Sequence, residues 1–332
     1  MREFKSLTFE EVIARLSAPA DTLVLFHRNP DADAVGSAFA MKKVLSDLGS
    51  RALCICESEI PKRLLFLTDG EQESVLPASI PEDFNAVRII SVDTASPAQM
   101  GELFPLYGDR VDLMIDHHGM GEPYADHYIR PDAAATGEIL FDLVKQLATE
   151  GLVTITDALC TSLYAAISAD TGGFRFSNVT PQTHLRTAEL MASGIDCAEI
   201  NHRLFDAFSL EQLRARGAGI SNLQLFADGK IAIITFPYAL KVALGLEDQH
   251  LDTLVDVARS LEGVRIAISI RQPETEGVFR VSVRSSCEYD VAALCAEFGG
   301  GGHKKAAGCT LTATDMDDAI QKIVSQIDAE SI

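Results

Sequence analysis

The stretch TLVLFHRNPDADAVGS (residues 22–37) decides how the chain folds. It begins with a short run of apolar and β-branched residues, Thr22 to His27, which is typical of a strand in a parallel sheet. A polar turn with an imidazole and two carboxylates follows, and a helical pattern then runs from Val35 to Leu48. A strand, a polar turn and a helix in this order predict one unit of an α/β fold.

The same alternation continues to about residue 152. Short apolar runs, each followed by a polar or acidic turn, alternate with helical patterns, as in a doubly wound, mainly parallel sheet. We expect strands at 22–27, 51–56, 87–92 and 111–115, and helices at 35–48, 134–148, 154–169 and from Thr180-Pro181 onward. The sequence therefore predicts an α/β domain over residues 1–190.

A second, smaller α/β domain is predicted at 222–332, after a helical and charged connection over residues 191–221. It opens with a hairpin whose turn, Asp228-Gly229, is a strong two-residue turn signal. Beyond the hairpin, we expect a helix at 251–261, strands at 264–271 and 278–285, and a Gly-rich loop at 299–302 before a last strand and helix.

The chain is acidic, with 28 Lys and Arg against 48 Asp and Glu and a net charge of −20 at pH 7. Because non-specific affinity for nucleic acid comes mostly from clustered cations, we expect no long duplex as a partner. Apolar runs are far shorter than the roughly 20 residues of a membrane span. The N-terminus leads into a helix capping box at Thr8 to Glu11 and not into the apolar core of a signal peptide. We therefore expect a cytoplasmic protein without membrane contact.

Four separate segments carry Asp or His near the carboxyl ends of predicted strands or helices. Taken singly, such an aspartate is most often a helix cap or turn residue, and such a histidine a partly buried polar one. In an open α/β sheet, however, the carboxyl ends of the strands are where ligands bind. The side chains concerned are His27, Asp31 and Asp33 in the first segment, Asp93 in the second, Asp116, His117 and His118 in the third, and Asp170 in the fourth.

Carboxylates gathered in one crevice would repel one another unless cations lay between them. Carboxylates and imidazoles without thiolates suit Mn²⁺, Mg²⁺ or Co²⁺, and the imidazoles favour Mn²⁺ over Mg²⁺. Four aspartates and two divalent ions cancel in charge, and two ions about 3.5 to 4 Å apart can activate a water for in-line displacement at phosphorus. These residues therefore predict hydrolysis of a phosphoester with two divalent metal ions.

Five short motifs follow one another along the chain: His27-Asn29-Pro30-Asp31-Asp33-Gly36-Ser37, Val92-Asp93-Thr94, Asp116-His117-His118, Asp170-Thr171-Gly172-Phe174 and GGGHKKAAG at 300–308. The first four resemble, in order and spacing, the motifs of the DHH phosphoesterase family. The fifth resembles the G-G-G-H-x-x-A-A-G signature of the family's associated C-terminal domain. The resemblance covers nearly the whole chain and implies the two-domain α/β fold of that family.

The resemblance also implies a role for each side chain. It assigns His27, Asp31 and Asp93 to one metal ion, and Asp33, Asp93, His117 and Asp170 to the other, with Asp93 bridging. Asp116 would orient a histidine, and His118 would face the substrate phosphate or the leaving group. The expected catalytic residues are therefore Asp93, Asp116 and His118.

The expected substrate-binding residues lie in the C-terminal domain. Glycines at 299–302 let successive backbone N–H groups approach an anion, although a glycine run alone is more often a flexible turn. Arg284 resembles the family's substrate-binding arginine and has the guanidinium fork for a bidentate phosphate contact, although a lone arginine on a strand is usually solvated. The expected set is Arg284, Ser285, Gly300, Gly301, Gly302 and His303.

Within the family, the chain resembles the compact branch that hydrolyses oligoribonucleotides of about two to five nucleotides and removes phosphate from 3′-phosphoadenosine 5′-phosphate (pAp). Manganese-dependent inorganic pyrophosphatases have a different second domain, and the signature at 300–308 argues against them. The alternatives are a phosphodiesterase for linear dinucleotides (pApA, pGpG) or cyclic ones, and a non-catalytic nucleotide-binding sensor. The expected partners are short RNA or DNA oligonucleotides or pAp, and a homodimer is left open.

Overall fold

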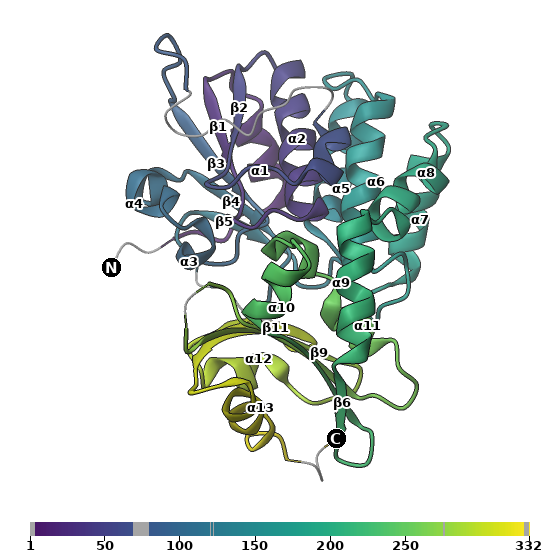
Figure 1. Cartoon of the computed structure of the whole chain (residues 1–332). Helices are drawn as coiled ribbons and strands as arrows, with labels where there is room; N and C mark the ends of the chain where they lie inside the picture. Colours follow the sequence, from purple (N-terminus) through teal and green to yellow (C-terminus); the bar gives the residue numbers. More distant parts are fainter. Residues whose placement is uncertain (1–3, 69–79, 120, 122, 275, 329–331) are drawn as a thin grey trace. The chain divides into compact units, whose positions relative to one another are not determined.

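A computed structural model gives the structure of the chain and describes residues 4–68, 80–119, 121, 123–274, 276–328 and 332. The chain divides into two compact units, Met1–Ala207 and Phe208–Ile332. Each unit is an α/β structure with its own sheet (Figure 1). No helix in the described part of the chain is long and apolar enough to cross a membrane.

The N-terminal sheet has the strand order β2-β1-β3-β4-β5, and every neighbouring pair is parallel. Its strands are β1 (Thr22–Leu25), β2 (Ala52–Ile55), β3 (Arg88–Val92), β4 (Leu113–Asp116) and β5 (His127–Ile129). The predicted parallel α/β fold is thus confirmed. The sequence pattern missed β5, which is a short edge strand. Because β1 lies between β2 and β3, the topological switch point, where open sheets bind ligands, lies at the carboxyl ends of β1 and β3.

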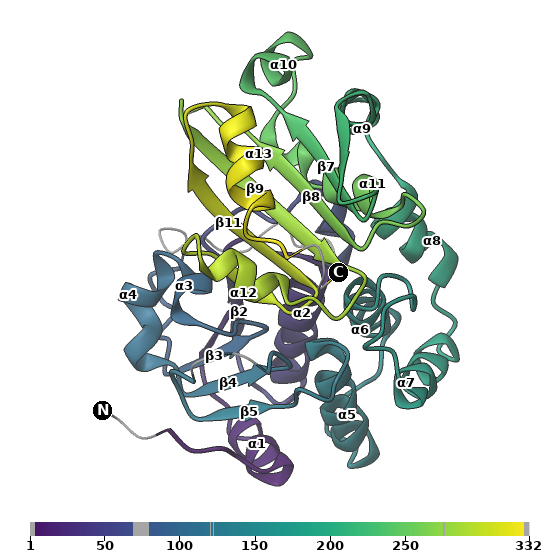
Figure 2. The same cartoon turned by 90° about the horizontal axis from the view of Figure 1, so that it is seen from below.

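The helical elements of this unit are α1 (Phe9–Leu16), α2 (Ala32–Asp47), η1 (Lys62–Leu67), α3 (Pro97–Met100), α4 (Leu103–Tyr107), η3 (Gly108–Arg110), α5 (Thr136–Thr149), α6 (Asp157–Asp170), α7 (Pro181–Met191), α8 (Cys197–Asn201) and the π-helical turn η4 (His202–Asp206). Helices α2, α5 and α6 lie together on one face of the sheet, with α3 and α4 on the other (Figures 1 and 2). Successive residues of β1 therefore enter different cores: Val24 packs towards α2, and Leu25 towards α3 and α4. Burial on both faces explains why β1 is a continuous apolar run.

Glycine allows the close approach of α2 to α6. A Cβ atom at Gly36 would come within 2.4 Å of the main-chain oxygen of Ser162, so no larger residue fits there without a shift. This packing brings the start of α2 and the end of α6 to the same edge of the sheet. Both ends carry predicted site residues.

Helix α2 begins earlier than its predicted start at Val35. Asp31 is the N-cap, and its carboxylate accepts a hydrogen bond of 3.0 Å from the N–H of Ala34. Asp33 was expected in the turn but lies instead in the first turn of the helix, where it is fully buried. The capping box predicted at Thr8 and Glu11 is present and confirmed.

The C-terminal sheet has the order β10-β11-β9-β8-β7-β6, in which β7 and β8 are parallel and the other neighbours antiparallel. Its strands are β6 (Leu223–Phe226), β7 (Ile231–Phe236), β8 (Ile266–Arg271), β9 (Val278–Ser285), β10 (Gly301–His303) and β11 (Ala306–Thr312). Its helical elements are α9 (Leu210–Ser221), α10 (Tyr238–Ala243), η5 (Asp248–Leu251), α11 (Leu254–Arg259), α12 (Val291–Ala296) and α13 (Met316–Val324). Helices α12 and α13 cover one face, and α9 and α11 the other (Figure 2).

Two expectations for this unit need correction. The helix expected at 251–261 is the 3-10 turn η5 followed by the shorter helix α11. The Gly-rich segment is not an open loop: it turns at Gly299 and Gly300 and then pairs with β11 as the edge strand β10. The glycines make this pairing possible, because a Cβ at Gly300 would lie 2.2 Å from the oxygen of Gly308 and one at Gly302 would lie 2.5 Å from that of Ala306.

Candidate active site

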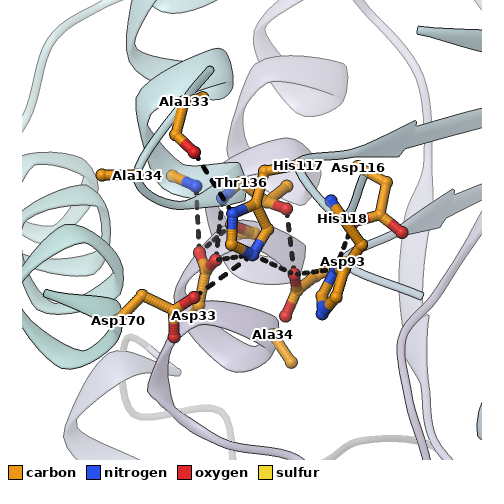
Figure 3. Close-up of polar contacts among 12 residues, drawn as sticks. Asp33, Ala34, Asp93, Asp116, His117, His118, Ala133, Ala134, Thr136 and Asp170 are labelled. Carbon is orange, nitrogen blue, oxygen red and sulfur yellow. Dashed lines mark hydrogen bonds and ion pairs between the residues drawn. The ribbon is translucent and has the colours of Figure 1, made fainter. Parts of the chain in front are cut away.

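The site lies at the switch point of the N-terminal sheet. All eight residues predicted there come together: His27 follows β1, Asp31 and Asp33 start α2, Asp93 follows β3, Asp116 to His118 end and follow β4, and Asp170 ends α6. Figure 3 shows the Nε2 edge of the His117 ring directed at Asp33, Asp93 and Asp170. Parallel strands place their carboxyl ends at one edge, which is why segments far apart in sequence meet here.

Asp93 lies between two groups of possible metal ligands. Its Oδ2 is 3.7 Å from Nε2 of His27, which is itself 3.7 Å from Oδ1 of Asp31. Its Oδ1 is 3.7 Å from Nε2 of His117. The ligand atoms within the first group, which are those of His27, Asp31 and Asp93, all lie within 4.8 Å of one another. The two oxygens of a single carboxylate thus face two different groups.

The second group is Asp33, His117 and Asp170, whose ligand atoms also lie within 4.8 Å of one another. Nε2 of His117 is 3.2 Å from Asp170 and 3.9 Å from Asp33. Asp170 is the last residue of α6, where the helix dipole disfavours a negative charge. A cation beside Asp170 would remove that penalty.

Asp93 adopts an unusual backbone conformation, with φ at 51°, in the left-handed region that most residues avoid. Tyr124 contacts the residues on both sides of Asp93. Its hydroxyl donates to the main-chain oxygen of Thr94 at 2.9 Å and lies 2.6 Å from the hydroxyl of Ser91. This support holds the Asp93 side chain at the sheet edge.

Both histidines after β4 have one ring nitrogen fixed by the protein. Nδ1 of His117 lies 3.3 Å from the main-chain oxygen of Ala133, and Nδ1 of His118 lies 2.6 Å from Oδ1 of Asp116. Because these oxygens accept hydrogen bonds, each Nδ1 carries the proton and each Nε2 is the atom left for a metal ion or a substrate. Asp116 is fully buried, and its Oδ2 accepts no hydrogen bond from any described residue.

Among the described residues, no Lys or Arg forms an ion pair with the carboxylates of the site, whose partners are histidines. Burial, together with the charges of Asp93 and Asp170, raises the pKa of Asp33 well above its usual range. Burial and the charge of Asp31 raise the pKa of Asp93 to about 6. Although burial acts in the opposite direction, the hydrogen bond and charge of Asp170 raise the pKa of His117 to about 11. The protein thus favours positive charge among these carboxylates.

The donor set fits divalent cations. It consists of carboxylate oxygens and imidazole nitrogens without a thiolate, the combination that suits Mn²⁺ and related ions. In the described residues the clusters able to hold a metal ion all belong to this site. The geometry is therefore that of a candidate metal centre in which Asp93 belongs to the first ligand group and faces His117 of the second.

In the C-terminal unit, Arg284 lies on β9 and is half-buried. It forms no ion pair with any described carboxylate, and its guanidinium donates to the main-chain oxygen of Val283 at 3.1 Å. Burial lowers the pKa of its guanidinium somewhat. A partly buried arginine without a carboxylate partner is suited to receive an anion.

The other residues predicted to bind substrate are placed differently. Ser285 is buried, and its hydroxyl donates to the oxygen of Cys287 at 2.9 Å, which does not favour a substrate contact. The N–H of Gly300 donates to the oxygen of Cys295 and so is not presented to an anion as we expected. Gly301 and Gly302 lie in β10, and the side chain of His303 lies outside the described part of the structure.

Sequence reasoning missed two residues that touch the site, Thr136 and Gly137 at the start of α5. Their N–H groups donate to the carboxylate of Asp33 at 2.7 and 2.9 Å, and the Thr136 hydroxyl donates to Asp93 at 2.9 Å. A Thr-Gly pair at a helix start is too common to stand out. Only the packing of α5 against α2 reveals it.

Taken together, the parallel sheet and the cluster at its switch point define an α/β protein with a candidate metal centre. Residues 21–167 match the N-terminal domain of the DHH family, and residues 235–329 match the DHHA1 domain. The chain is 30% identical over 321 residues to the bifunctional oligoribonuclease and PAP phosphatase NrnA of Thermus thermophilus, covering 96% of this chain and 92% of that one. The chain belongs to the DHH phosphoesterase family, which confirms the resemblance of its motifs.

Two further relatives extend the comparison. A probable bifunctional oligoribonuclease and PAP phosphatase NrnA of Streptococcus mutans is 24% identical over 323 residues, covering 95% of this chain and 97% of that one. The crystal structure of an exopolyphosphatase-related protein from Bacteroides fragilis has a TM-score of 0.84 at 22% identity, covering 95% of this chain and 94% of that one. The fold is therefore similar along nearly the whole chain.

Proposed function

We propose that this protein is a metal-dependent phosphoesterase that hydrolyses short oligoribonucleotides to mononucleotides and pAp to AMP and phosphate. The observation that carries the proposal is the position of Asp93 between two groups of ligands, an arrangement suited to two ions that share one carboxylate. The names of the relatives from Thermus thermophilus and Streptococcus mutans support the choice of substrates.

Two divalent cations, for which Mn²⁺ suits this donor set best, would supply an activated water and neutralise charge on the phosphate. We assign His27, Asp31 and Asp93 to one ion, and Asp33, Asp93, His117 and Asp170 to the other. Asp93 therefore determines the position of both ions.

We propose that His118 acts on the leaving group. In the hydrolysis, the oxygen of water bonds to phosphorus and the water gives up a proton, while the bond from phosphorus to the ribose oxygen breaks and the ribose oxygen takes up a proton. Although burial acts in the opposite direction, the hydrogen bond and charge of Asp116 raise the pKa of His118, which favours a ring that carries a proton on Nε2 as well as on Nδ1, and Nε2 is the atom that delivers its proton. Asp116 is thus a positioning residue for His118.

We assign substrate binding to the C-terminal domain, taken as residues 222–332, and catalysis to residues 1–190, with 191–221 as the connection. Arg284 binds a phosphate group of the substrate, because it is half-buried and has no carboxylate partner among the described residues. Ser285, Gly300, Gly301, Gly302 and His303 lie near Arg284 in sequence or strand pairing and would be neighbours of that phosphate, although the Ser285 hydroxyl and the Gly300 N–H already donate within the protein.

The experiment is the release of phosphate from pAp and of AMP from pApA by the purified chain, with Mn²⁺ and with EDTA. The test variant is Asp93→Asn, and the matched control is Asp83→Asn, which alters an exposed carboxylate paired with Arg51. Mn²⁺-dependent hydrolysis that Asp93→Asn loses and Asp83→Asn keeps would support the proposal.

Two outcomes would overturn it. Hydrolysis of linear or cyclic dinucleotides without any turnover of pAp would indicate a dinucleotide phosphodiesterase. Binding of these nucleotides without hydrolysis of any of them would indicate a sensor.

A further inference from the structure

Thr136, the first residue of α5, contacts two carboxylates of the candidate site. Its hydroxyl donates to Oδ1 of Asp93 at 2.9 Å, and its main-chain N–H donates to Oδ2 of Asp33 at 2.7 Å (Figure 3). The residue is fully buried. It therefore joins the carboxylate that faces both ligand groups with a carboxylate of the second group.

The start of α5 depends on Asp33. The residue at the N-cap is Ala135, whose side chain has no hydrogen-bonding atom, so the helix has no cap of its own. The Asp33 carboxylate replaces it by accepting the N–H groups of Thr136 and Gly137. The position of α5 and the orientation of Asp33 thus fix each other.

Gly137 lets this contact form. A Cβ atom at position 137 would lie 2.5 Å from Cβ of Ala166 on α6. Helix α5 can therefore approach α6 closely enough for its first N–H groups to reach Asp33. The same approach places the Thr136 hydroxyl at Asp93.

The hydroxyl selects one of the two oxygens of Asp93. It donates to Oδ1, the oxygen that faces His117, and leaves Oδ2 directed at His27. A carboxylate accepts but cannot donate a hydrogen bond, so the Thr136 hydroxyl is the donor. This bond holds the carboxylate plane so that each oxygen faces its own ligand group.

We propose that Thr136 is a positioning residue for metal binding, because it fixes the orientation of Asp93 through its hydroxyl and that of Asp33 through its main-chain N–H. The inference rests on the metal centre of the proposed function. Residues that orient metal ligands typically contribute about 10- to 100-fold to metal affinity or activity.

The experiment measures Mn²⁺ binding to the metal-free full-length chain by calorimetry, without any substrate. Thr136→Val keeps the shape of the side chain and the N–H group but removes the hydroxyl. Thr136→Ser keeps the hydroxyl. The matched control is Thr187→Val, which removes a buried hydroxyl that donates to the main-chain oxygen of Thr183 within α7.

The expected result is that Thr136→Val weakens Mn²⁺ binding by about 10- to 100-fold, while Thr136→Ser and Thr187→Val bind within a few-fold of the unchanged chain. Circular dichroism of the metal-free proteins confirms that each variant is folded. If Thr136→Val does not fold, Thr136→Ala takes its place, with the same expected loss.

Wild-type affinity for Mn²⁺ in the folded Thr136→Val or Thr136→Ala chain would overturn the inference, as would an equal loss in Thr136→Ser. If the wild-type chain binds no Mn²⁺, both the role of Thr136 and the proposed metal centre are contradicted. A wild-type chain that binds Mn²⁺ but does not hydrolyse pAp would remove the proposed function and leave the role of Thr136 standing.

Discussion

Oδ1 of Asp116 lies 2.6 Å from Nδ1 of His118 and also accepts the main-chain N–H of the same histidine at 2.9 Å. The two residues are separated by His117 alone, so the sharp turn after β4 closes a small ring between them. The ring fixes both the rotamer and the tautomer of His118, with the proton on Nδ1. This contact supports the proposal that Asp116 acts through the histidine that it holds.

Asp116→Asn tests this relationship. An amide at this position lacks the negative charge that raises the pKa of His118, and its NH₂ group can face Nδ1, so the ring no longer holds a proton on both nitrogens. We expect kcat on pAp to fall by on the order of 10²-fold or more, with the amount of bound Mn²⁺ unchanged. Steady-state kinetics and metal analysis of the same preparation measure both quantities.

His118→Gln provides the second half of the test. If Asp116 acts through His118, the double variant Asp116→Asn/His118→Gln loses no more activity than His118→Gln alone, because residues that act as a unit are not additive. Fully additive losses would mean that Asp116 has a separate role.

Asp93→Ala is expected to remove more activity than any other single change among the candidate ligands. Its carboxylate faces both ligand groups, so its loss disturbs both ions, whereas the loss of His27 or Asp170 disturbs one. We expect kcat to fall by several powers of ten in a chain that remains folded. Near-normal turnover by folded Asp93→Ala at saturating Mn²⁺ would contradict the assignment.

The sequence predicted the members of the N-terminal cluster because each follows the end of a strand or helix, and parallel strands place those ends together. It did not predict which atoms meet. The hydrogen bond from Thr136 to Asp33 joins residues 103 positions apart and depends on the packing of α2, α5 and α6 around Gly36 and Gly137. Such packing is a property of the folded chain and leaves no local pattern.

The glycine run at 299–302 has a clear local pattern, but that pattern fits two different structures. Glycine is compatible both with an anion-binding loop and with close pairing of two strands, so composition alone cannot separate the two. In the structure the N–H of Gly300 donates to Cys295, and Gly301 and Gly302 lie in β10, which pairs with β11. The short strand β5 was missed because three residues are too few for a periodic pattern.

Arg284→Ala is expected to separate substrate binding from catalysis. Removing a charge-assisted phosphate contact should lower kcat/KM on pAp or a dinucleotide by on the order of 10²-fold, while bound Mn²⁺ is unchanged. Lysine at this position should restore little, because an ammonium lacks the guanidinium fork.

In Arg284→Ala, kcat/KM on the small ester bis-p-nitrophenyl phosphate should fall much less than kcat/KM on pAp, since the ester lacks a second phosphate. Arg280→Ala is the matched control, because Arg280 lies on the same strand but is exposed and paired with Asp248. Equal losses on both substrates, or a loss of metal, would refute a role limited to substrate binding.

Short substrates are expected to be preferred. The chain is strongly acidic overall, with a net charge of −20, and long strands are usually bound along extended cationic tracks. The catalytic efficiency on oligonucleotides of two to five residues should therefore exceed that on a 24-mer. An efficiency on the 24-mer that equals or exceeds that on the short substrates would require a further nucleic-acid track.

The most direct test of the account is the location of manganese by anomalous diffraction in crystals grown with Mn²⁺. We predict two ions about 3.5 to 4 Å apart, each bound to one oxygen of Asp93, with His27 and Asp31 on one ion and Asp33, His117 and Asp170 on the other. A single ion, or two ions that do not share Asp93, would contradict the central claim.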